Sequence, residues 1–125
     1  MAKRDEVLAA LNDLLRLEDV LACMLARKGL DGIVPANLKI KQVDLWRLIQ
    51  QTTSQFFDII NKFFDFGMDR LYFELGDHTI ILVPISQEFA LIVIIPSLAN
   101  LGLLDVEIEN TSRKVKALLS QKEEA

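Results

Sequence analysis

The sequence predicts an α/β protein, specifically an α+β three-layer sandwich with helices on both faces of one five-stranded antiparallel sheet. The first observation concerns residues 69–96, where one strand of alternating polar and apolar residues precedes two strands that are apolar on both faces. Strands of that kind need apolar cover on both sides of the sheet. The second observation is that helical patterns stand before, between and after the strands. The third is Pro35, which marks an edge strand because proline cannot donate to a strand ladder.

Composition limits the class of protein. The chain has 125 residues, of which 51% are hydrophobic and 26% are charged, and its net charge is −4. These values predict a single folded domain over residues 1–125 with a sizeable core, and they argue against a disordered chain. Charges of both signs are interspersed and form no basic stripe, so we expect no nucleic-acid partner.

Three features predict a cytoplasmic protein without membrane insertion. The longest apolar runs have about seven residues, whereas a membrane helix needs about 20. Residues 1–6 carry charges of both signs, which predicts no signal peptide. Cys23 is the only cysteine, so no internal disulfide can form, and this fits a reducing compartment.

The N-terminal part predicts a helix followed by a hairpin. Apolar residues recur at helical spacing over residues 7–15, which indicates an amphipathic helix of about four turns. The apolar run at residues 20–26 indicates a buried strand, and the glycines of residues 29–32 indicate a turn. The returning strand, residues 33–38, contains Pro35 and is therefore placed at a sheet edge.

Residues 42–66 predict the longest helix. Residues that alternate three and four apart lie on one stripe, and they are Trp46, Ile49, Thr53, Phe56, Ile60 and Phe63. Leu45, Leu48 and Ile59 flank the stripe on one side, and Phe57 and Phe64 flank it on the other. The apolar arc therefore covers about half of the circumference, whereas a surface helix needs little more than about 100°. We expect something besides its own sheet to cover this helix.

Three strands and a helix complete the chain. Residues 70–75 alternate polar and apolar side chains, so this strand is only half apolar and fits a sheet edge. Residues 79–83 and 89–95 are apolar on both faces and fit central strands. Helical spacing from Leu101 to Leu118 predicts a final helix that Asn100 or Ser97 caps. The polar tail, residues 121–125, is expected to fray.

The predicted element order is α-β-β-α-β-β-β-α. Both hairpins impose antiparallel pairing, and burial ranks the strands from centre to edge. The sheet order that satisfies these demands is 2-1-5-4-3, with strands numbered along the chain. The long helix covers one face of this sheet, and the two terminal helices cover the other.

No residue pattern indicates catalysis, a cofactor or a metal. His78 is the only histidine, and a metal site needs several ligands. Cys23 lies in an apolar run without a basic neighbour, so we interpret it as a core thiol. Gly29 and Gly32 precede a strand rather than a helix, which argues against a phosphate-binding loop. Since no Ser/His/Asp set or carboxylate pair appears either, we expect that the protein is not an enzyme.

The order of these features resembles the roadblock family, or dynein light chain roadblock-type domain, which includes MglB-like regulators of Ras-like small GTPases. The resemblance extends over residues 6–119. It rests on the Leu-rich first helix, the turn Lys28-Gly29-Leu30-Asp31-Gly32, the long central helix, the strand end Val83-Pro84, and Asn100-Leu101-Gly102-Leu103-Leu104 at the start of the last helix. None of these features is a catalytic signature, so their order and spacing carry the resemblance.

This resemblance implies a homodimer in which the long helices pack together and the edge strands pair into one extended sheet. The implied interface residues are Phe57, Phe64, Arg70, Leu71, Tyr72, Phe73 and Glu74. The dimer is then a platform for a Ras-like small GTPase, as a scaffold or GTPase-activating regulator without an active site or cofactor of its own. A polar strip at helical spacing is the candidate partner-binding surface, and it consists of Arg47, Gln51, Ser54, Asp58 and Lys62.

A second function class stays open. The aromatic long helix and the sheet could enclose an apolar pocket, which would make the protein a small-ligand sensor domain. A well-packed dimer favours the regulator, whereas an enclosed apolar void with convergent polar groups favours the sensor. A heterodimer with a related subunit also stays open, as does the choice between activating a GTPase and only tethering it.

Overall fold

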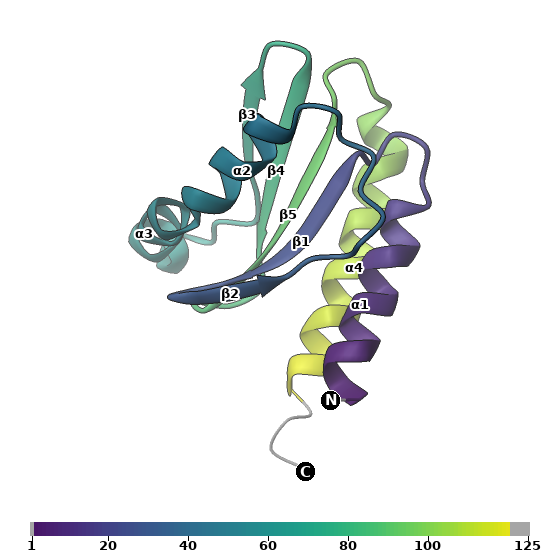
Figure 1. Ribbon diagram of the computed structural model, residues 1–125. Coiled ribbons are helices and arrows are strands. Elements are labelled where there is room, and N and C mark those ends of the chain that lie inside the picture. The colour runs from purple at the N-terminus through teal and green to yellow at the C-terminus, as the bar shows by residue number, and fades with distance from the viewer. Residues whose placement is uncertain (1, 121–125) are drawn as a thin grey trace.

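Five strands lie between two layers of helices in the computed structural model, which describes residues 2–120 (Figure 1). The helices are α1 (Ala2–Leu15), α2 (Val43–Gln51), α3 (Thr53–Phe63), the 3₁₀ helix η1 (Phe64–Phe66) and α4 (Leu101–Ser120). The strands are β1 (Ala22–Arg27), β2 (Leu30–Ile33), β3 (Leu71–Leu75), β4 (His78–Pro84) and β5 (Phe89–Pro96). The tail that was expected to fray, residues 121–125, lies outside the described residues.

The sheet is antiparallel and has the order β2-β1-β5-β4-β3, which confirms the predicted order. β5 lies at its centre, where Val93 pairs with Cys23 of β1 and with Ile81 of β4. The three central strands are almost entirely buried, whereas β2 and β3 are largely exposed. β2 and β3 are therefore the two edges.

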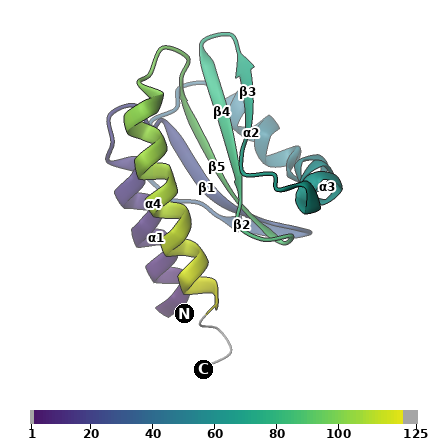
Figure 2. The ribbon, with the colours of Figure 1, turned by 180° about the vertical axis from the view of Figure 1, so that it is seen from behind.

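Helices cover both faces of the sheet, as predicted. α1 and α4 lie side by side on one face, and α2 and α3 lie on the other (Figures 1 and 2). Successive side chains of a strand point to opposite faces. In β5, Leu91, Val93 and Ile95 join the core under α1 and α4, and Ile92 and Ile94 join the core under α2 and α3. Each face thus has its own apolar core, and the sheet separates the two.

The single long helix predicted for residues 42–66 is wrong, because two helices and a 3₁₀ turn occupy this segment. α2 and α3 meet at Thr52, which has φ −96° and ψ 1°, and their axes point in different directions (Figure 1). Thr52 donates its N–H to the Ile49 carbonyl (3.1 Å) and its hydroxyl to the Leu48 carbonyl (2.6 Å). A hydroxyl bonded one turn back bends helices, and the β-branched Thr53 follows directly. The break between α2 and α3 could not be seen in the apolar stripe, because the stripe continues on both sides of Thr52.

The first hairpin turns earlier than predicted. Gly29, with φ +73°, lies in the turn, and β2 begins at the next residue, so residues 33–38 do not form the returning strand. Pro35 follows β2 and is buried. The chain then passes β1, where Lys39 donates its N–H to the Leu21 carbonyl (2.8 Å). β2 is still an edge strand, as predicted, and the segment after it covers the rest of β1.

The terminal helices match the predicted ones. Leu103 donates its N–H to Asn100 Oδ1 (3.4 Å), so Asn100 caps α4. Ser97 instead donates its N–H to the Asp77 carbonyl (2.8 Å), which ties the connection before α4 to the β3–β4 hairpin. α4 has 20 residues. Neither it nor any other helix within residues 2–120 has the length and apolar character that a membrane crossing needs.

Candidate functional site

The outer side of β3 is an unpaired strand edge. Ser97 N–H donates to the Asp77 carbonyl across the β4–β5 ladder, and backbone groups in antiparallel strands alternate in direction. The odd-numbered residues of β4 therefore bond to β5, and its even-numbered residues bond to β3. The β3 partners of these even-numbered residues are Leu71, Phe73 and Leu75. The N–H and C=O groups of Tyr72 and Glu74 thus point outward, where they can template a further strand.

An apolar groove lies beside this edge, between the α2–α3 layer and β3 and β4. Its volume is about 210 Å³, and its lining residues are Leu45, Leu48, Ile49, Thr52, Phe56, Phe73, Leu75 and Ile80. Leu48 and Leu75 are 59% and 49% exposed. The rings of Phe56 and Phe73 stack within the groove, with their centroids 5.4 Å apart. Exposed apolar surface next to an open edge is typical of a protein–protein interface.

On the other face of the sheet, charged side chains tie β3 to α4. The guanidinium of Arg70, whose side chain is only 15% exposed, pairs with the carboxylates of Asp105 and Glu109. It also donates to the Asp105 carbonyl (3.2 Å), and the Tyr72 hydroxyl donates to the Asp105 carboxylate (3.4 Å). Arg113 donates to Glu109 from the next turn of α4 (3.1 Å). Arg70 therefore positions the start of β3, and its guanidinium is not free to reach a partner.

The other predicted interface residues differ in their burial. Tyr72 and Glu74 are exposed, and Phe64, Leu71 and Phe73 are half-buried. Phe57 is wrong as an interface residue, because its side chain is 1% exposed and packs in the core under α3. The change of direction at Thr52 turns α3 relative to α2, so Phe57 faces the sheet instead of flanking the stripe.

All five residues of the predicted partner-binding strip are exposed, but they lie on two helices. Arg47 and Gln51 belong to α2, and Ser54, Asp58 and Lys62 belong to α3. One continuous strip is therefore wrong, since the helix axis changes direction between the two groups. The strip is instead two short polar faces that meet at the helix joint.

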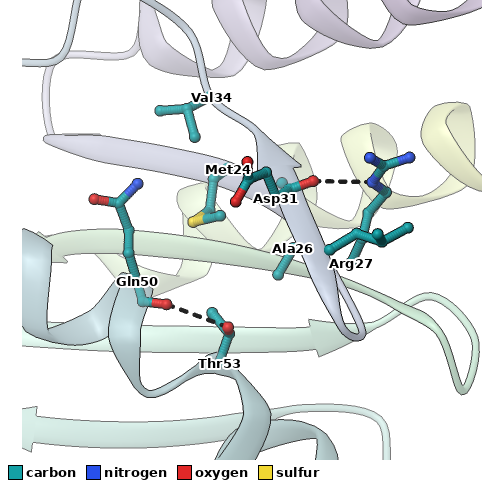
Figure 3. A pocket seen from close by; sticks show the side chains of 9 residues that line it. Met24, Ala26, Arg27, Asp31, Val34, Gln50 and Thr53 are labelled. Carbon is teal, nitrogen blue, oxygen red and sulfur yellow. Dashed lines mark hydrogen bonds between the residues drawn. The ribbon is translucent and has the colours of Figure 1, made fainter.

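A second hollow lies where the α2–α3 joint faces the β1–β2 hairpin (Figure 3). Its volume is about 350 Å³, and its lining residues are Met24, Ala26, Arg27, Leu30, Asp31, Gly32, Val34, Gln50 and Thr53. Gly32 is required where β2 passes β1, because a Cβ there would lie 2.6 Å from both the Leu25 carbonyl oxygen and the terminal methyl of Met24. The hollow combines an apolar floor with polar walls.

Cys23 and His78 belong to the sheet itself. Cys23 is fully buried, its thiol donates to the Leu11 carbonyl (3.4 Å), and burial raises its pKa to about 12. A neutral, enclosed thiol is a poor nucleophile, which confirms the interpretation of Cys23 as a core thiol. His78 pairs with Leu75 at the hairpin. Within residues 2–120, no three His, Cys, Asp or Glu side chains are grouped so that they could hold a metal ion.

Several contributors to these sites were missed by the sequence analysis. Asp105 and Glu109 are four residues apart on α4, a spacing that places two carboxylates on one helix face. That spacing could have identified the pair, but their partner Arg70 is 35 residues from Asp105 along the chain. Asp31 and Gln50 both line the second hollow, although one comes from β2 and the other from α2. No local pattern connects such residues.

Comparison with known proteins agrees with this architecture. MglB from Myxococcus xanthus superimposes with a TM-score of 0.75 at 14% identity, over 92% of this chain and 95% of that chain. The gliding protein MglB from Thermus thermophilus gives 0.70 at 12% identity, over 97% and 93%. A Roadblock/LC7 domain from Streptomyces avermitilis gives 0.63 at 17% identity, over 90% and 96%. These similarities confirm the roadblock fold that the sequence resemblance implied.

The sequence itself gives a family assignment. No curated protein matches it. Residues 3–109 match the family described as AF0774-like protein, and this match spans α1, the entire sheet and the first half of α4. The chain therefore belongs to the AF0774-like protein family, and it has the fold of roadblock and MglB proteins.

Proposed function

We propose that this protein is a non-enzymatic interaction module that forms a homodimer through β3 and serves as a scaffold or GTPase-activating regulator of a Ras-like small GTPase. The observation that carries the proposal is the outer edge of β3, where outward backbone groups lie beside an apolar groove. Pairing two such edges removes an aggregation liability and covers the groove. The fold shared with MglB proteins supports the same assignment.

Two-fold symmetry gives the dimer its geometry. A two-fold axis perpendicular to the sheet and beside β3 sets two copies of the strand antiparallel. Tyr72 and Glu74 of each protomer then supply the ladder bonds, and both α2–α3 layers lie on the same side of the extended sheet. Leu48 and Leu75 of the two grooves are brought toward one another and lose their exposure to water. The apolar groove is open at the surface and lacks convergent polar groups, so this geometry accounts for it better than a small-ligand sensor does.

The joined α2–α3 layers form the platform for the GTPase. Their exposed polar faces, Arg47 and Gln51 on α2 and Ser54, Asp58 and Lys62 on α3, are the proposed contacts. A regulator of a switch protein acts by binding one nucleotide state more tightly than the other. We propose that the dimer favours the GTP-bound state and that any hydrolysis takes place in the active site of the GTPase.

The test of this function is binding to Ras-like GTPases of the same cell. Each GTPase is loaded with GDP or with a non-hydrolysable GTP analogue and titrated onto the immobilised protein. We expect tighter binding of the GTP-analogue form by one of them. The purified protein alone is expected to hydrolyse no GTP. Turnover by the isolated protein that a point substitution within it abolishes would contradict the proposal, and so would the absence of any nucleotide-dependent binding.

The proposed contact surface can be tested by double charge reversal. Arg47→Glu combined with Asp58→Lys keeps the net charge and is expected to weaken GTPase binding by more than about 1 kcal/mol, because both groups lie in the desolvated contact. The matched control is Asp13→Lys with Arg16→Glu, which reverses an exposed ion pair (3.1 Å) at the C-terminal end of α1. Calorimetric titration should show unchanged affinity for the control. Equal affinity for both double variants would remove Arg47 and Asp58 from the contact.

A further inference from the structure

We propose that the hollow between the α2–α3 joint and the β1–β2 hairpin binds a cation on an aliphatic stem, either a lysine side chain of a partner or a free linear diamine. This site lies at the β2 side of the sheet, away from β3 (Figure 1). The inference does not rest on the proposed dimer or on a GTPase partner. Its grounds are the shape, the charge and the apolar lining of the hollow.

The shape suits a linear ligand. The hollow of about 350 Å³ adjoins a second one of about 450 Å³. The second is lined by Gly29, Leu30, Asp31, Gln51, Thr53 and Ser54. Leu30, Asp31 and Thr53 line both, so the two hollows form one elongated cleft along the tip of the hairpin. Such a cleft can take an extended chain more readily than a compact molecule.

Charge sets the sign of the ligand. Asp31 is the only charged residue that lines both parts of the cleft, and no ion pair within residues 2–120 engages its carboxylate. Arg27 lines only the first of the two hollows. Its Nε donates to the Asp31 carbonyl (2.9 Å), and its guanidinium lies on the far side of Asp31 from Gln50 (Figure 3). The C-terminal end of α2 and the N-terminal end of α3 meet here, and their opposite dipoles offset one another. The Asp31 carboxylate therefore favours a cation.

The remaining lining suits the stem and the head of such a ligand. Met24, Ala26 and Val34 form an apolar surface, against which the methylenes of a lysine-like chain can pack. Thr53 donates its hydroxyl to the Gln50 carbonyl (3.2 Å), which leaves the oxygen free to accept from an ammonium group. The side chain of Gln50, which also lines the hollow, has a carbonyl oxygen that is a second acceptor. An apolar stem with a terminal ammonium matches this combination of an apolar surface, oxygen acceptors and one carboxylate.

The first test uses cadaverine (1,5-diaminopentane) as the probe. ¹⁵N-labelled protein is titrated at low ionic strength, and we expect saturable shifts at the backbone amides of Gly32 and Thr53 and at the Gln50 side-chain amide. Pentane-1,5-diol and glutarate are matched probes of the same length with no charge and with negative charge. They are expected to cause no shifts at these positions. Equal shifts with the diol, or absence of shifts with both cadaverine and the lysine peptide described below, would overturn the proposal.

Two variants identify the carboxylate. Asp31→Asn removes the charge and keeps the shape, and it is expected to weaken cadaverine binding at least tenfold. Asp65→Asn, in the exposed η1 turn, is the control and is expected to bind like the wild type. Both changes are at exposed residues, and the spectra of the free variants report whether the fold is intact. Wild-type affinity of Asp31→Asn would overturn the proposal.

A peptide distinguishes the two sources of the cation. The probe is the capped tripeptide acetyl-Val-Lys-Val-amide, compared with its Val-Gln-Val counterpart. Tighter binding of the lysine peptide than of cadaverine, with shifts that extend along β2, would support a partner's lysine as the ligand. Tighter binding of cadaverine would support a free diamine. Failure of both the lysine peptide and cadaverine to bind would refute the cation site, whatever the outcome of the GTPase experiments.

Discussion

The two edges of the sheet treat their unpaired backbone groups differently. The β2 edge is protected within its own chain: β2 has only four residues, its register with β1 slips between Leu25 and Arg27, and the segment after Pro35 runs past the rest of β1. The β3 edge has a regular register through Leu75 and His78. Nothing in the described part of the chain covers its outer side. The same sheet therefore has one short, irregular edge and one regular edge.

This difference shows that the two edge strands of one sheet can differ in how readily they pair with another chain. Irregular, short and covered edges resist pairing with another chain, whereas a regular edge beside apolar surface invites it. On the β3 side, Arg70 and Tyr72 are bonded to Asp105 of α4, and these bonds hold the strand in position. Single substitutions at either edge test this difference, because they should change the oligomeric state at β3 and the stability at β2.

The largest effect is expected at β3. Tyr72→Pro removes an outward N–H from each protomer but no bond to β4, so the dimer should dissociate while the monomer stays folded. Two symmetric losses should raise the dimer Kd at least about 100-fold, or about 3 kcal/mol. Sedimentation over a dilution series measures this change.

The control for this change is Tyr72→Phe. It loses only the hydroxyl bond to Asp105 and keeps the outward N–H, so we expect it to remain a dimer. A Tyr72→Pro protein that dimerises like the wild type would place the interface elsewhere.

At the β2 edge, Gly32→Ala should destabilise the fold without changing the oligomeric state. The new Cβ would lie 2.6 Å from the Leu25 carbonyl oxygen, a backbone atom that cannot rotate away, and overpacking of this kind costs about 1 to 3 kcal/mol. Urea unfolding measures the loss. Gly102→Ala in α4 is the control, because its Cβ would meet only Asn100 Oδ1 at 3.4 Å and alanine favours the helix by up to about 1 kcal/mol. Equal stability of the two variants would contradict the tight crossing of β2 over β1.

Cys23 lies on β1, next to β2. The pH dependence of the unfolding free energy tests whether its thiol is buried there. Burial raises its pKa to about 12 in the folded protein, so above the unfolded pKa the unfolded chain binds fewer protons than the native one. Stability is therefore complete below about pH 9 and falls from there toward pH 12, by up to about 1.4 kcal/mol per pH unit from this group. Cys23→Ala lacks this contribution, and the difference between the two urea-unfolding series isolates it from other titrating groups. Parallel pH profiles would show that the thiol is accessible.

The smallest effect is expected for Pro35→Thr. Pro35 lies after β2 and away from β3, so the variant should keep the wild-type oligomeric state and change stability by less than about 1 kcal/mol. Sedimentation and thermal unfolding check both statements. A change of oligomeric state would show that the β2 side also takes part in self-association.

The strand order could be predicted because its signals are local. The alternation of residues 70–75 marks one edge, and doubly apolar runs mark the centre. Pro35, from which the other edge was predicted, lies after β2 and not within it. The helix break could not be predicted, because residues on both sides of Thr52 keep an apolar stripe and only a hydroxyl bond and a backbone angle separate α2 from α3. Phe57 was misplaced for the same reason, since the helical wheel assumed one axis.

The site residues were less predictable than the fold. The proposed interface on β3 follows from an alternating pattern and a family resemblance, and both can be read along the chain. Arg70 pairs with Asp105, and Asp31 and Gln50 line the same hollow, although these residues are separated in sequence. Such contacts depend on how the helical layers pack on the sheet. The spacing of residues along the sequence does not predict that packing.

The central claim is that β3 joins two copies of this chain, and sedimentation equilibrium of the wild-type protein tests it most directly. At micromolar concentration the account predicts a mass of twice 14.2 kDa, with concentration-dependent dissociation on dilution. A folded protein that remains at the monomer mass throughout this range would contradict the account.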